Sequence, residues 1–442
     1  MTSGSMRGFA AYLRGLRSLL GASLQAGGVR GDSSFGVAPA ELAHALDGGP
    51  RRALRSTVPL QTRRASGAFF TSEDLATRLW DVPDRFPHGA VADPACGAGD
   101  LLLTVARHLP VRRTLRRTLR EWGRHLAGFD IHAEFVKATR VRLALLAISR
   151  GVLVRGFALD ELDQTLPSIR CGDGLLRLHE LAPVSHFLLN PPYSIMPAPG
   201  GLAWWGRGGV SRAALFIDQC LLSARQGARI SAVLPDVLRS GTLYQRWREH
   251  VARRAAVDRI ELVGRFEPEV DVDVFLLELT VAAGGRAVSW WNEPNRQRGV
   301  FGERFRIGVG SYVPFRSSGR GPWQPYLEPG NCPPWGEIRQ VTGHKRYDGR
   351  LNEPPFLAIR RTSNPKDAAR AVASLVLGPR PVAVENHLLV AHPKDGRIGT
   401  CREALAIVQS PKTNVWLNQR LRCRHLTLRA LSELPWWSGR HG

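Results

Sequence analysis

Short apolar runs and amphipathic stretches alternate along the chain from about residue 67 to residue 282. Seven apolar runs have the length of strands and are bounded by turn-forming residues. These runs cover residues 89–95, 126–132, 168–173, 186–190, 228–235, 259–264 and 274–282. Helical periodicity lies between several of them, at 101–109, 134–151 and 213–227. Because strands that alternate with amphipathic helices form βαβ units, the pattern predicts an α/β fold with a doubly wound, mostly parallel seven-stranded sheet.

The segments on either side of this region have a different character. Residues 1–60 are rich in Arg, Gly and Ala and contain one or two helical patterns, so we expect a basic, partly helical lead-in. Its first part is similar in composition to a transit peptide, although an ordinary basic amphipathic helix is the preferred interpretation. After about residue 285 the periodicity gives way to Gly-, Pro- and Trp-rich sequence. We therefore expect an α/β domain at 61–285 and a smaller domain at 286–442, whose stretch at 314–336 could equally be a linker.

Charge narrows the range of partners. The chain of 442 residues has 61 Lys and Arg against 38 Asp and Glu, a net charge of +23. This balance suits nucleic acid or an anionic membrane surface, and the alternative is a solvated basic surface. No apolar run reaches the roughly 18 residues of a membrane span. The cysteines lack any CxxC or Cys/His metal spacing, which favours a reducing cytoplasm and no metal site: Cys96, Cys171, Cys220, Cys332, Cys401 and Cys423.

A glycine-containing turn follows the first expected strand. The sequence runs Asp93-Pro94-Ala95-Cys96-Gly97-Ala98-Gly99-Asp100 into an apolar helix. Glycines at 97 and 99 permit a tight turn and let a ligand lie against bare backbone at the amino end of the helix. The third glycine of GxGxxG is missing and no GxxxxGK[ST] occurs, so a dinucleotide or a triphosphate is disfavoured. Taken alone, the turn could equally be a plain connection between a strand and a helix.

Acidic residues follow three consecutive strands of this region. Asp93 ends the first, Asp130 ends the second, and Asp173 follows the third. The carboxyl ends of such strands share one edge of the sheet, where ligands bind. Asp130 could accept hydrogen bonds from ribose hydroxyls, or it could be only a helix cap or surface turn acid. Acids without a basic phosphate clamp suit a cationic adenosine compound, and S-adenosylmethionine fits because its sulfonium and ammonium groups are positive.

The fourth strand ends abruptly in Asn190-Pro191-Pro192-Tyr193. The prolines cannot donate to a sheet ladder and stiffen the backbone that follows. With DPACGAGDLL, GFDIH, CGDG and NPPY in this order, the chain resembles gamma-type N6-adenine DNA methyltransferases. The resemblance implies a class I, Rossmann-like methyltransferase fold at 61–285, S-adenosylmethionine as cofactor, and a target-recognition domain at 286–442.

The resemblance also implies a set of binding residues. Upstream, SGAFFTSEDLA at 66–76 is similar to the family segment that closes over the methionine end of the cofactor, although Thr71-Ser72-Glu73-Asp74 is also a possible helix capping box. The cofactor-binding residues implied by the family motifs are Thr71, Asp93, Ala95, Cys96, Gly97, Gly99, Asp130, Ile131, Asp173 and Asn190.

The same resemblance gives the NPPY residues catalytic roles. The amino group of adenine is a weak nucleophile, and the Asn190 side-chain oxygen and the Pro191 carbonyl would both accept hydrogen bonds from it as charge develops. Pro192 would stiffen the loop, and Tyr193 would stack on an adenine flipped out of the duplex. The structural alternative is that Asn190 and the prolines merely end a strand. In the loop that follows, Trp204 and Trp205 could fill the gap left by the base or pack on the second domain.

Double-stranded DNA is the expected partner, within restriction-modification or phage defence, together with a possible cognate restriction endonuclease or defence-system subunit. A fused nuclease is not expected, because Pro235-Asp236 lacks a nearby E-x-K. The alternatives are a non-catalytic DNA-specificity subunit or an amino-methyltransferase of protein glutamine or RNA. Methylation of cytosine N4 usually goes with Ser at the Asn position, so Asn190 favours adenine without excluding cytosine.

Overall fold

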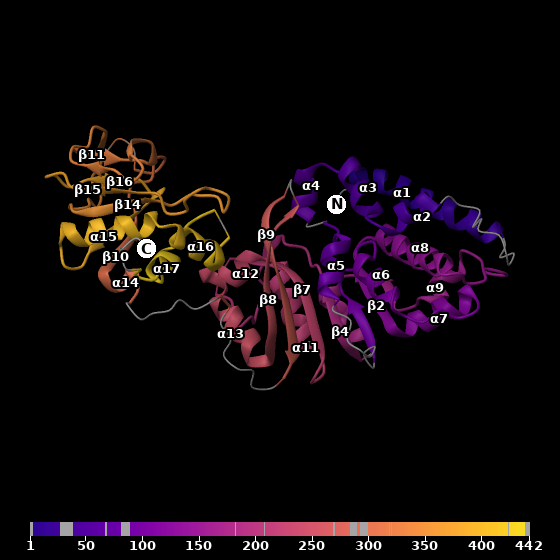
Figure 1. Cartoon of the computed structure of the whole chain (residues 1–442). Helices are drawn as coiled ribbons and strands as arrows, with labels where there is room; N and C mark the ends of the chain where they lie inside the picture. Colours follow the sequence, from indigo (N-terminus) through magenta and orange to yellow (C-terminus); the bar gives the residue numbers. More distant parts are fainter. Residues whose placement is uncertain are drawn as a thin grey trace. The chain divides into compact units, whose positions relative to one another are not determined.

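The structure is a computed structural model, and it divides the chain into two compact units. It describes residues 3–26, 39–66, 69–80, 89–181, 183–206, 208–267, 270–282, 290–291, 299–317, 319, 321–422 and 424–437. Unit 1 comprises residues 1–238, 245–263 and 274–288, and unit 2 comprises residues 239–244, 264–273 and 289–442. Figure 1 shows the chain coloured along its sequence.

Among the described residues, seven strands form one sheet in the order β3-β2-β1-β4-β7-β9-β8. Parallel pairs join β3 to β2, β2 to β1, β1 to β4 and β4 to β7, whereas β9 runs antiparallel to β7. The predicted doubly wound, mostly parallel sheet is therefore confirmed. Its strands are β1 (Ala90–Asp93), β2 (Leu126–Asp130), β3 (Ile169–Cys171), β4 (Val184–Leu189), β7 (Arg229–Pro235), β8 (Ala255–Glu267) and β9 (Val270–Val281).

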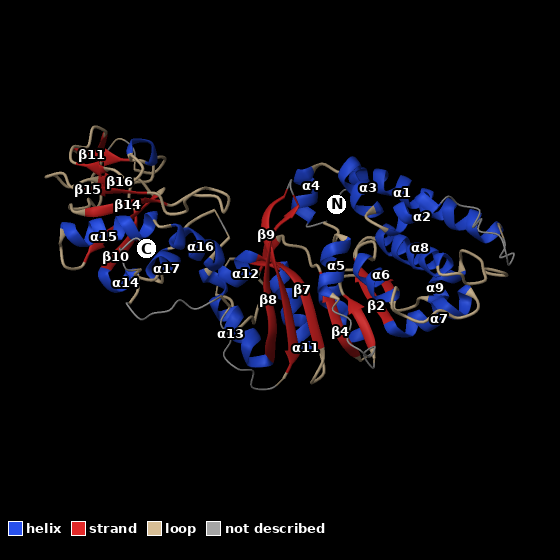
Figure 2. Ribbon diagram, viewed as in Figure 1, coloured by secondary structure: helices blue, strands red, loops and turns tan. Residues whose placement is uncertain are grey.

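The central strands are apolar because helices cover them. Val91 in β1 and Leu188 in β4 are fully buried, as expected for parallel strands covered on both faces. Helix α8 contacts both α6 and α7, and α11 contacts α13 and β7 (Figure 2). The helices before residue 289 are α1 (Ser3–Gln25), α2 (Pro39–Leu46), α3 (Gly49–Thr57), α4 (Leu60–Ser66), α5 (Glu73–Leu79), α6 (Asp100–Ala106), α7 (Leu115–His125), α8 (Ala133–Ser149), α9 (Glu161–Thr165), α10 (Gly174–Arg177), α11 (Arg212–Ser223), α12 (Asp236–Ser240) and α13 (Gln245–Arg254), with 3₁₀ helices η1 (Leu178–Glu180) and η2 (Thr242–Tyr244). No helix in the described part of the chain is both long and apolar enough to cross a membrane.

The amino-terminal segment that we expected as a lead-in is packed into unit 1. Helix α1 lies against α8 and α3. The ring of Phe9 is fully buried, with its centroid 4.5 Å from that of Phe135 and 6.2 Å from that of Phe70. The fully buried Arg142 of α8 donates from Nε to Ala45 O over 2.9 Å. The first helices therefore support the α/β sheet.

Two short strands follow the NPPY sequence and were not predicted. β5 (Ile195–Pro197) and β6 (Gly209–Ser211) pair antiparallel and lead into α11. In the connection between them, Trp204 is 3% exposed and its ring centroid lies 6.2 Å from that of His250. Trp204 is therefore buried next to a residue of unit 1, and its two roles considered from the sequence stay predictions.

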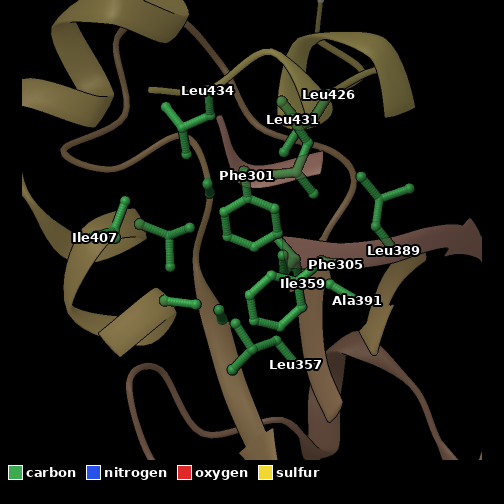
Figure 3. Close-up of a cluster of buried hydrophobic side chains, with 14 of the residues drawn as sticks. Phe301, Phe305, Leu357, Ile359, Leu389, Ala391, Ile407, Leu426, Leu431 and Leu434 are labelled. Atoms are coloured by element: carbon green, nitrogen blue, oxygen red, sulfur yellow. The ribbon is translucent and has the colours of Figure 1, made fainter. Parts of the chain in front are cut away.

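The described part of unit 2 contains a five-stranded sheet of order β10-β17-β14-β15-β12 and a three-stranded sheet of order β13-β11-β16. A cluster of buried side chains from strands and helices forms a core (Figure 3), and the rings of Phe301 and Phe305 stack within it with centroids 4.5 Å apart. The elements are α14 (Phe301–Arg304), β10 (Phe305–Val309), β11 (Trp323–Leu327), η3 (Pro329–Asn331), β12 (Glu337–Ile338), β13 (His344–Arg346), β14 (Phe356–Arg360), β15 (Ala373–Val376), β16 (Ala383–Val384), β17 (Leu388–Pro393), α15 (Ile398–Gln409), α16 (Pro411–Arg420) and α17 (Leu428–Ser432).

Phe9→Ala should destabilise unit 1, because it leaves a cavity between α1 and the rings of Phe70 and Phe135. Truncation of a buried aromatic residue costs about 3–5 kcal/mol of unfolding free energy. Urea unfolding would measure the change, with Arg14→Ala on the exposed face of the same helix as a control within about 0.5 kcal/mol of wild type. Equal stability of Phe9→Ala and Arg14→Ala would contradict the packing of α1.

Candidate active site

A cavity lies where four parallel strands of unit 1 end. β1 ends in Asp93, β2 ends in Asp130, Asp173 lies two residues beyond β3, and Asn190 directly follows β4. All four residues line this cavity, which has a volume of about 780 Å³ including the space open to solvent. The acids and the amide that the sequence assigned to one sheet edge are therefore brought together.

Most of the expected residues share this cavity. The expected residues that line it are Thr71, Asp93, Ala95, Cys96, Gly97, Asp130, Ile131, Asp173, Asn190 and Pro192. Gly99, Pro191 and Tyr193 belong to the described chain but are not part of the lining. Pro191 is buried, and Tyr193 contacts Asn190 from outside the lining.

The two glycines of the turn are needed for the chain's own packing. Gly97 and Gly99 have φ angles of 52° and 86°, in the left-handed region that favours glycine. A Cβ on Gly97 would lie 2.7 Å from the ring of Phe70, and one on Gly99 would lie 2.6 Å from Cγ2 of Thr139. The glycines therefore allow side chains of the same unit to approach the turn, and Gly97 also forms part of the cavity wall.

The carboxylate of Asp93 is buried, that of Asp130 is half-buried, and both are fixed by backbone N–H groups. Asp93 Oδ1 accepts from the N–H of Ala95 over 3.0 Å. Asp130 accepts from Gly97 N over 3.1 Å and from His132 N over 2.8 Å. Burial raises the pKa of Asp93 to about 8 and that of Asp130 to about 6. Asp130 holds the turn in place, and each of its oxygens retains capacity to accept a second hydrogen bond.

The other two acids of the cavity have structural partners as well. Asp173 is the N-cap of α10, where Oδ1 accepts from Leu175 N over 3.0 Å. We had considered a helix-capping role for Asp130, and in the structure Asp173 has such a role, at the start of α10. Asp100 is ion-paired with Arg142, with 2.8 Å between Oδ1 and Nη1.

The amide of Asn190 is held by three side-chain hydrogen bonds. Its Nδ2 donates to Thr71 Oγ1 over 3.0 Å and to Phe69 O over 3.3 Å. Its Oδ1 accepts from the hydroxyl of Tyr193 over 3.0 Å. The same hydroxyl lies 3.3 Å from Val233 O on β7, and burial raises the pKa of Tyr193 well above its usual value. This network fixes which atom of the amide is the acceptor.

The sequence left two roles open for the segment with Thr71 and Ser72, a wall of the binding site and a helix cap. In the structure each role belongs to a different residue. Ser72 is the N-cap of α5, and its Oγ accepts from Leu75 N over 3.4 Å. Thr71 lines the cavity and contacts Asn190. Neighbouring residues therefore provide a helix cap and a wall of the candidate site.

The sequence did not identify several residues that line the cavity. They are aromatic residues, a cation and an imidazole: Phe69, Phe70, Phe135, Phe216, Arg212 and His132. Phe69 and Phe70 lie in the segment that was compared with the family, so only their individual roles were missed. Arg212 begins α11 and makes no side-chain hydrogen bond or ion pair with any described residue. Hydrophobic periodicity could not identify Arg212, because the position of this residue at the cavity depends on the β5–β6 pair that precedes α11.

Comparisons with known proteins show that this chain is similar in fold to solved structures. No protein-family model matches the chain, and no curated protein matches it. Among solved structures, the type IIL restriction-modification enzyme MmeI in complex with DNA matches with a TM-score of 0.50 and 11% identity, over 97% of this chain and 79% of that chain.

Two further solved structures match with lower TM-scores. A putative class I S-adenosylmethionine-dependent methyltransferase from Listeria monocytogenes has a TM-score of 0.38 and 14% identity over 63% of this chain and 88% of its own. A modification subunit of a putative type I restriction enzyme from Vibrio vulnificus YJ016 has a TM-score of 0.37 and 19% identity. The match covers 58% of this chain and 52% of that subunit. The seven-stranded, mostly parallel sheet of unit 1 gives this chain a doubly wound, Rossmann-like α/β fold, and the likeness to the DNA-bound enzyme is one of fold.

Asp93→Asn should flatten the dependence of stability on pH. Burial raises the pKa of Asp93 in the folded state to about 8 from its usual 3.8, so the stabilising contribution is complete below pH 3.8 and is lost as pH rises through about 8. Asparagine stays neutral and can still accept from Ala95 N. Urea unfolding from pH 5 to pH 8 should show a steeper fall in unfolding free energy for wild type than for Asp93→Asn. Parallel profiles would contradict a buried, protonated Asp93, and the exposed Asp74→Asn serves as control.

Proposed function

We propose that the chain is a DNA methyltransferase that transfers a methyl group from S-adenosylmethionine to the N6 amino group of adenine. The observation that carries this proposal is that Asn190, the first residue of NPPY, lines the same cavity as the acids that follow β1, β2 and β3. A methyl acceptor held at Asn190 would therefore meet a cofactor held by those acids.

The residues of the cavity fit S-adenosylmethionine in charge and polarity. Asp93, Asp130 and Asp173 complement a cofactor with two cationic centres and ribose hydroxyls. The side chains of Ile131 and Phe216 offer apolar surface to an adenine ring, and Arg212 offers a cation to the single carboxylate of the methionyl group. When bound, S-adenosylmethionine would supply an electrophilic methyl group.

Asn190 would activate the amino group of adenine by accepting from it. Thr71 and Phe69 hold the NH2 end of the amide, so Oδ1 is the acceptor. A carbonyl oxygen has two lone pairs, and Oδ1 can therefore bind both the Tyr193 hydroxyl and an amino group. The Pro191 carbonyl would be the second acceptor. Such preorganised acceptors would stabilise the positive charge that develops on the amino nitrogen as the N–C bond forms and S-adenosylhomocysteine leaves, after which the nitrogen releases one proton to solvent.

Direct displacement needs no nucleophilic cysteine. Cys96 lines the cavity, but burial raises the pKa of its thiol well above the usual value, so the reactive thiolate is not formed. Its thiol therefore serves as part of the apolar wall.

DNA as substrate is supported by the net charge of +23 and, at the level of fold, by the likeness to an enzyme solved with DNA. In this proposal unit 1 carries out the chemistry, and residues after about 285 select the sequence by contacts to phosphates and base edges. A cognate restriction endonuclease or another defence-system subunit would act with it.

Sequencing of modified bases in DNA from cells that express the protein would test this function. We expect N6-methyladenine at a defined motif, and its loss in Asn190→Ala, because removal of one such acceptor lowers turnover about 10²- to 10³-fold. N4-methylcytosine at that motif would contradict the choice of base. Unmodified DNA from cells with abundant folded protein would favour a non-catalytic specificity subunit.

Tyr193→Phe should lower kcat, because the ring stays and the hydrogen bond to Asn190 Oδ1 is lost. A neutral hydrogen bond contributes about 0.5–1.5 kcal/mol, which corresponds to roughly three- to tenfold in kcat with little change in KM for DNA. Tyr12→Phe loses a hydroxyl bonded to Ala45 O, away from Asn190, and is the matched control. A kcat equal to wild type in Tyr193→Phe would leave stacking as the only role of this tyrosine.

Arg212→Gln should weaken cofactor binding, because the methionyl carboxylate would lose its cationic partner. A hydrogen bond to a charged group contributes about 1.5–3 kcal/mol, so calorimetry should show S-adenosylmethionine affinity lowered about ten- to hundredfold. Arg124→Gln, at an exposed position in the last turn of α7, is the control. Unchanged cofactor affinity with weaker DNA binding would instead assign Arg212 to a phosphate of the substrate.

A further inference from the structure

A second cavity lies within unit 2, along the edge strand of its five-stranded sheet. It has a volume of about 1010 Å³ including space open to solvent. β10 and β17 form one side, where Arg306 pairs directly across the strands with His392. The segment that contains Arg350 and Asn352 contributes the rest of the wall. We name this feature the β10 groove.

Two arginines in the β10 groove have no side-chain partner among the residues that the structure describes. The side chains of Arg306 and Arg350 are exposed and make no hydrogen bond or ion pair with any described residue. Some other arginines of unit 2 are ion-paired: Arg402 with Glu337 over 2.9 Å and Arg429 with Glu433 over 2.7 Å. The groove is lined by these two guanidinium groups and by one carboxylate, that of Glu353, so its charge remains positive and an external anion could neutralise it.

The two arginines converge on one imidazole from different elements. His392 Nε2 lies 3.3 Å from Asn352 Oδ1. Burial, followed by the charges of Arg306 and Arg350, lowers the pKa of His392. At neutral pH the imidazole is uncharged, and the cationic character of the groove comes from the guanidinium groups.

We propose that the β10 groove binds the phosphate backbone of duplex DNA, with Arg306 and Arg350 as the contacts. Planar guanidinium groups match phosphate oxygens with two parallel hydrogen bonds. Two unpaired arginines on separate elements along an open groove suit a ligand with repeated phosphates better than a single small anion. The inference rests on the proposed function for its substrate class, and it gives unit 2 its backbone contacts.

The test uses the full-length protein and the variants Arg306→Gln, Arg350→Gln and Arg306→Lys. Fluorescence anisotropy with a duplex DNA would give the dissociation constant over a range of salt concentrations. Each phosphate contact contributes about 0.9 to the slope of log affinity against log salt. Both glutamine variants should therefore bind more weakly and show a slope about 0.9 smaller in magnitude, whereas Arg306→Lys should keep the slope of wild type.

Controls separate this inference from the proposed function. Arg402→Gln removes a cation of unit 2 that lies outside the groove. For this variant the slope of log affinity for DNA against log salt should equal that of wild type. S-adenosylmethionine affinity should be unchanged in all variants. If wild type binds and methylates DNA while both glutamine variants keep its slope, the groove assignment is overturned and the function stands. If wild type neither binds nor methylates DNA, both the function and the groove assignment fall.

Discussion

The guanidinium of Arg142 is fully buried in unit 1, and the candidate site depends on how its charge is satisfied. It donates to Ala45 O and Leu46 O at the end of α2 and to Ala98 O in the glycine turn, and it is paired with Asp100. A buried charge without partners is costly, so these groups must stay together for the fold to be stable. One side chain of α8 therefore joins the amino-terminal helices to the turn after β1.

The position of this turn determines what the cavity can bind. The turn presents Gly97 N to Asp130, so the carboxylates that follow β1 and β2 are held close together in a buried site. Burial favours their protonated forms, and a cationic ligand would favour the ionised forms. The acidic wall is thus better suited to a sulfonium and an ammonium group than to a phosphate. Asn190 lines the same cavity, and its amide is oriented by a hydrogen bond to Thr71.

The parts of the molecule that follow a local rule could be predicted from the sequence. The strands and their shared edge follow from short apolar runs, and Asp130 and Asn190 were expected at that edge because one ends β2 and the other directly follows β4. The packing of α1 could not be predicted, because it depends on contacts of Phe9 with residues far along the chain. The bond from Tyr193 to Asn190 depends on the path of the loop after two prolines. The β10 groove joins segments that no periodicity connects, so only the structure reveals it.

The most direct measurement of the central claim is mass spectrometry of nucleosides from DNA incubated with the purified protein and S-adenosylmethionine that carries a deuterated methyl group. The account predicts deuterium-labelled N6-methyladenine with wild type and at least about a hundredfold less with Asn190→Ala. Label on cytosine, or equal label on adenine with Asn190→Ala, would contradict the role given to the NPPY residues at the end of β4.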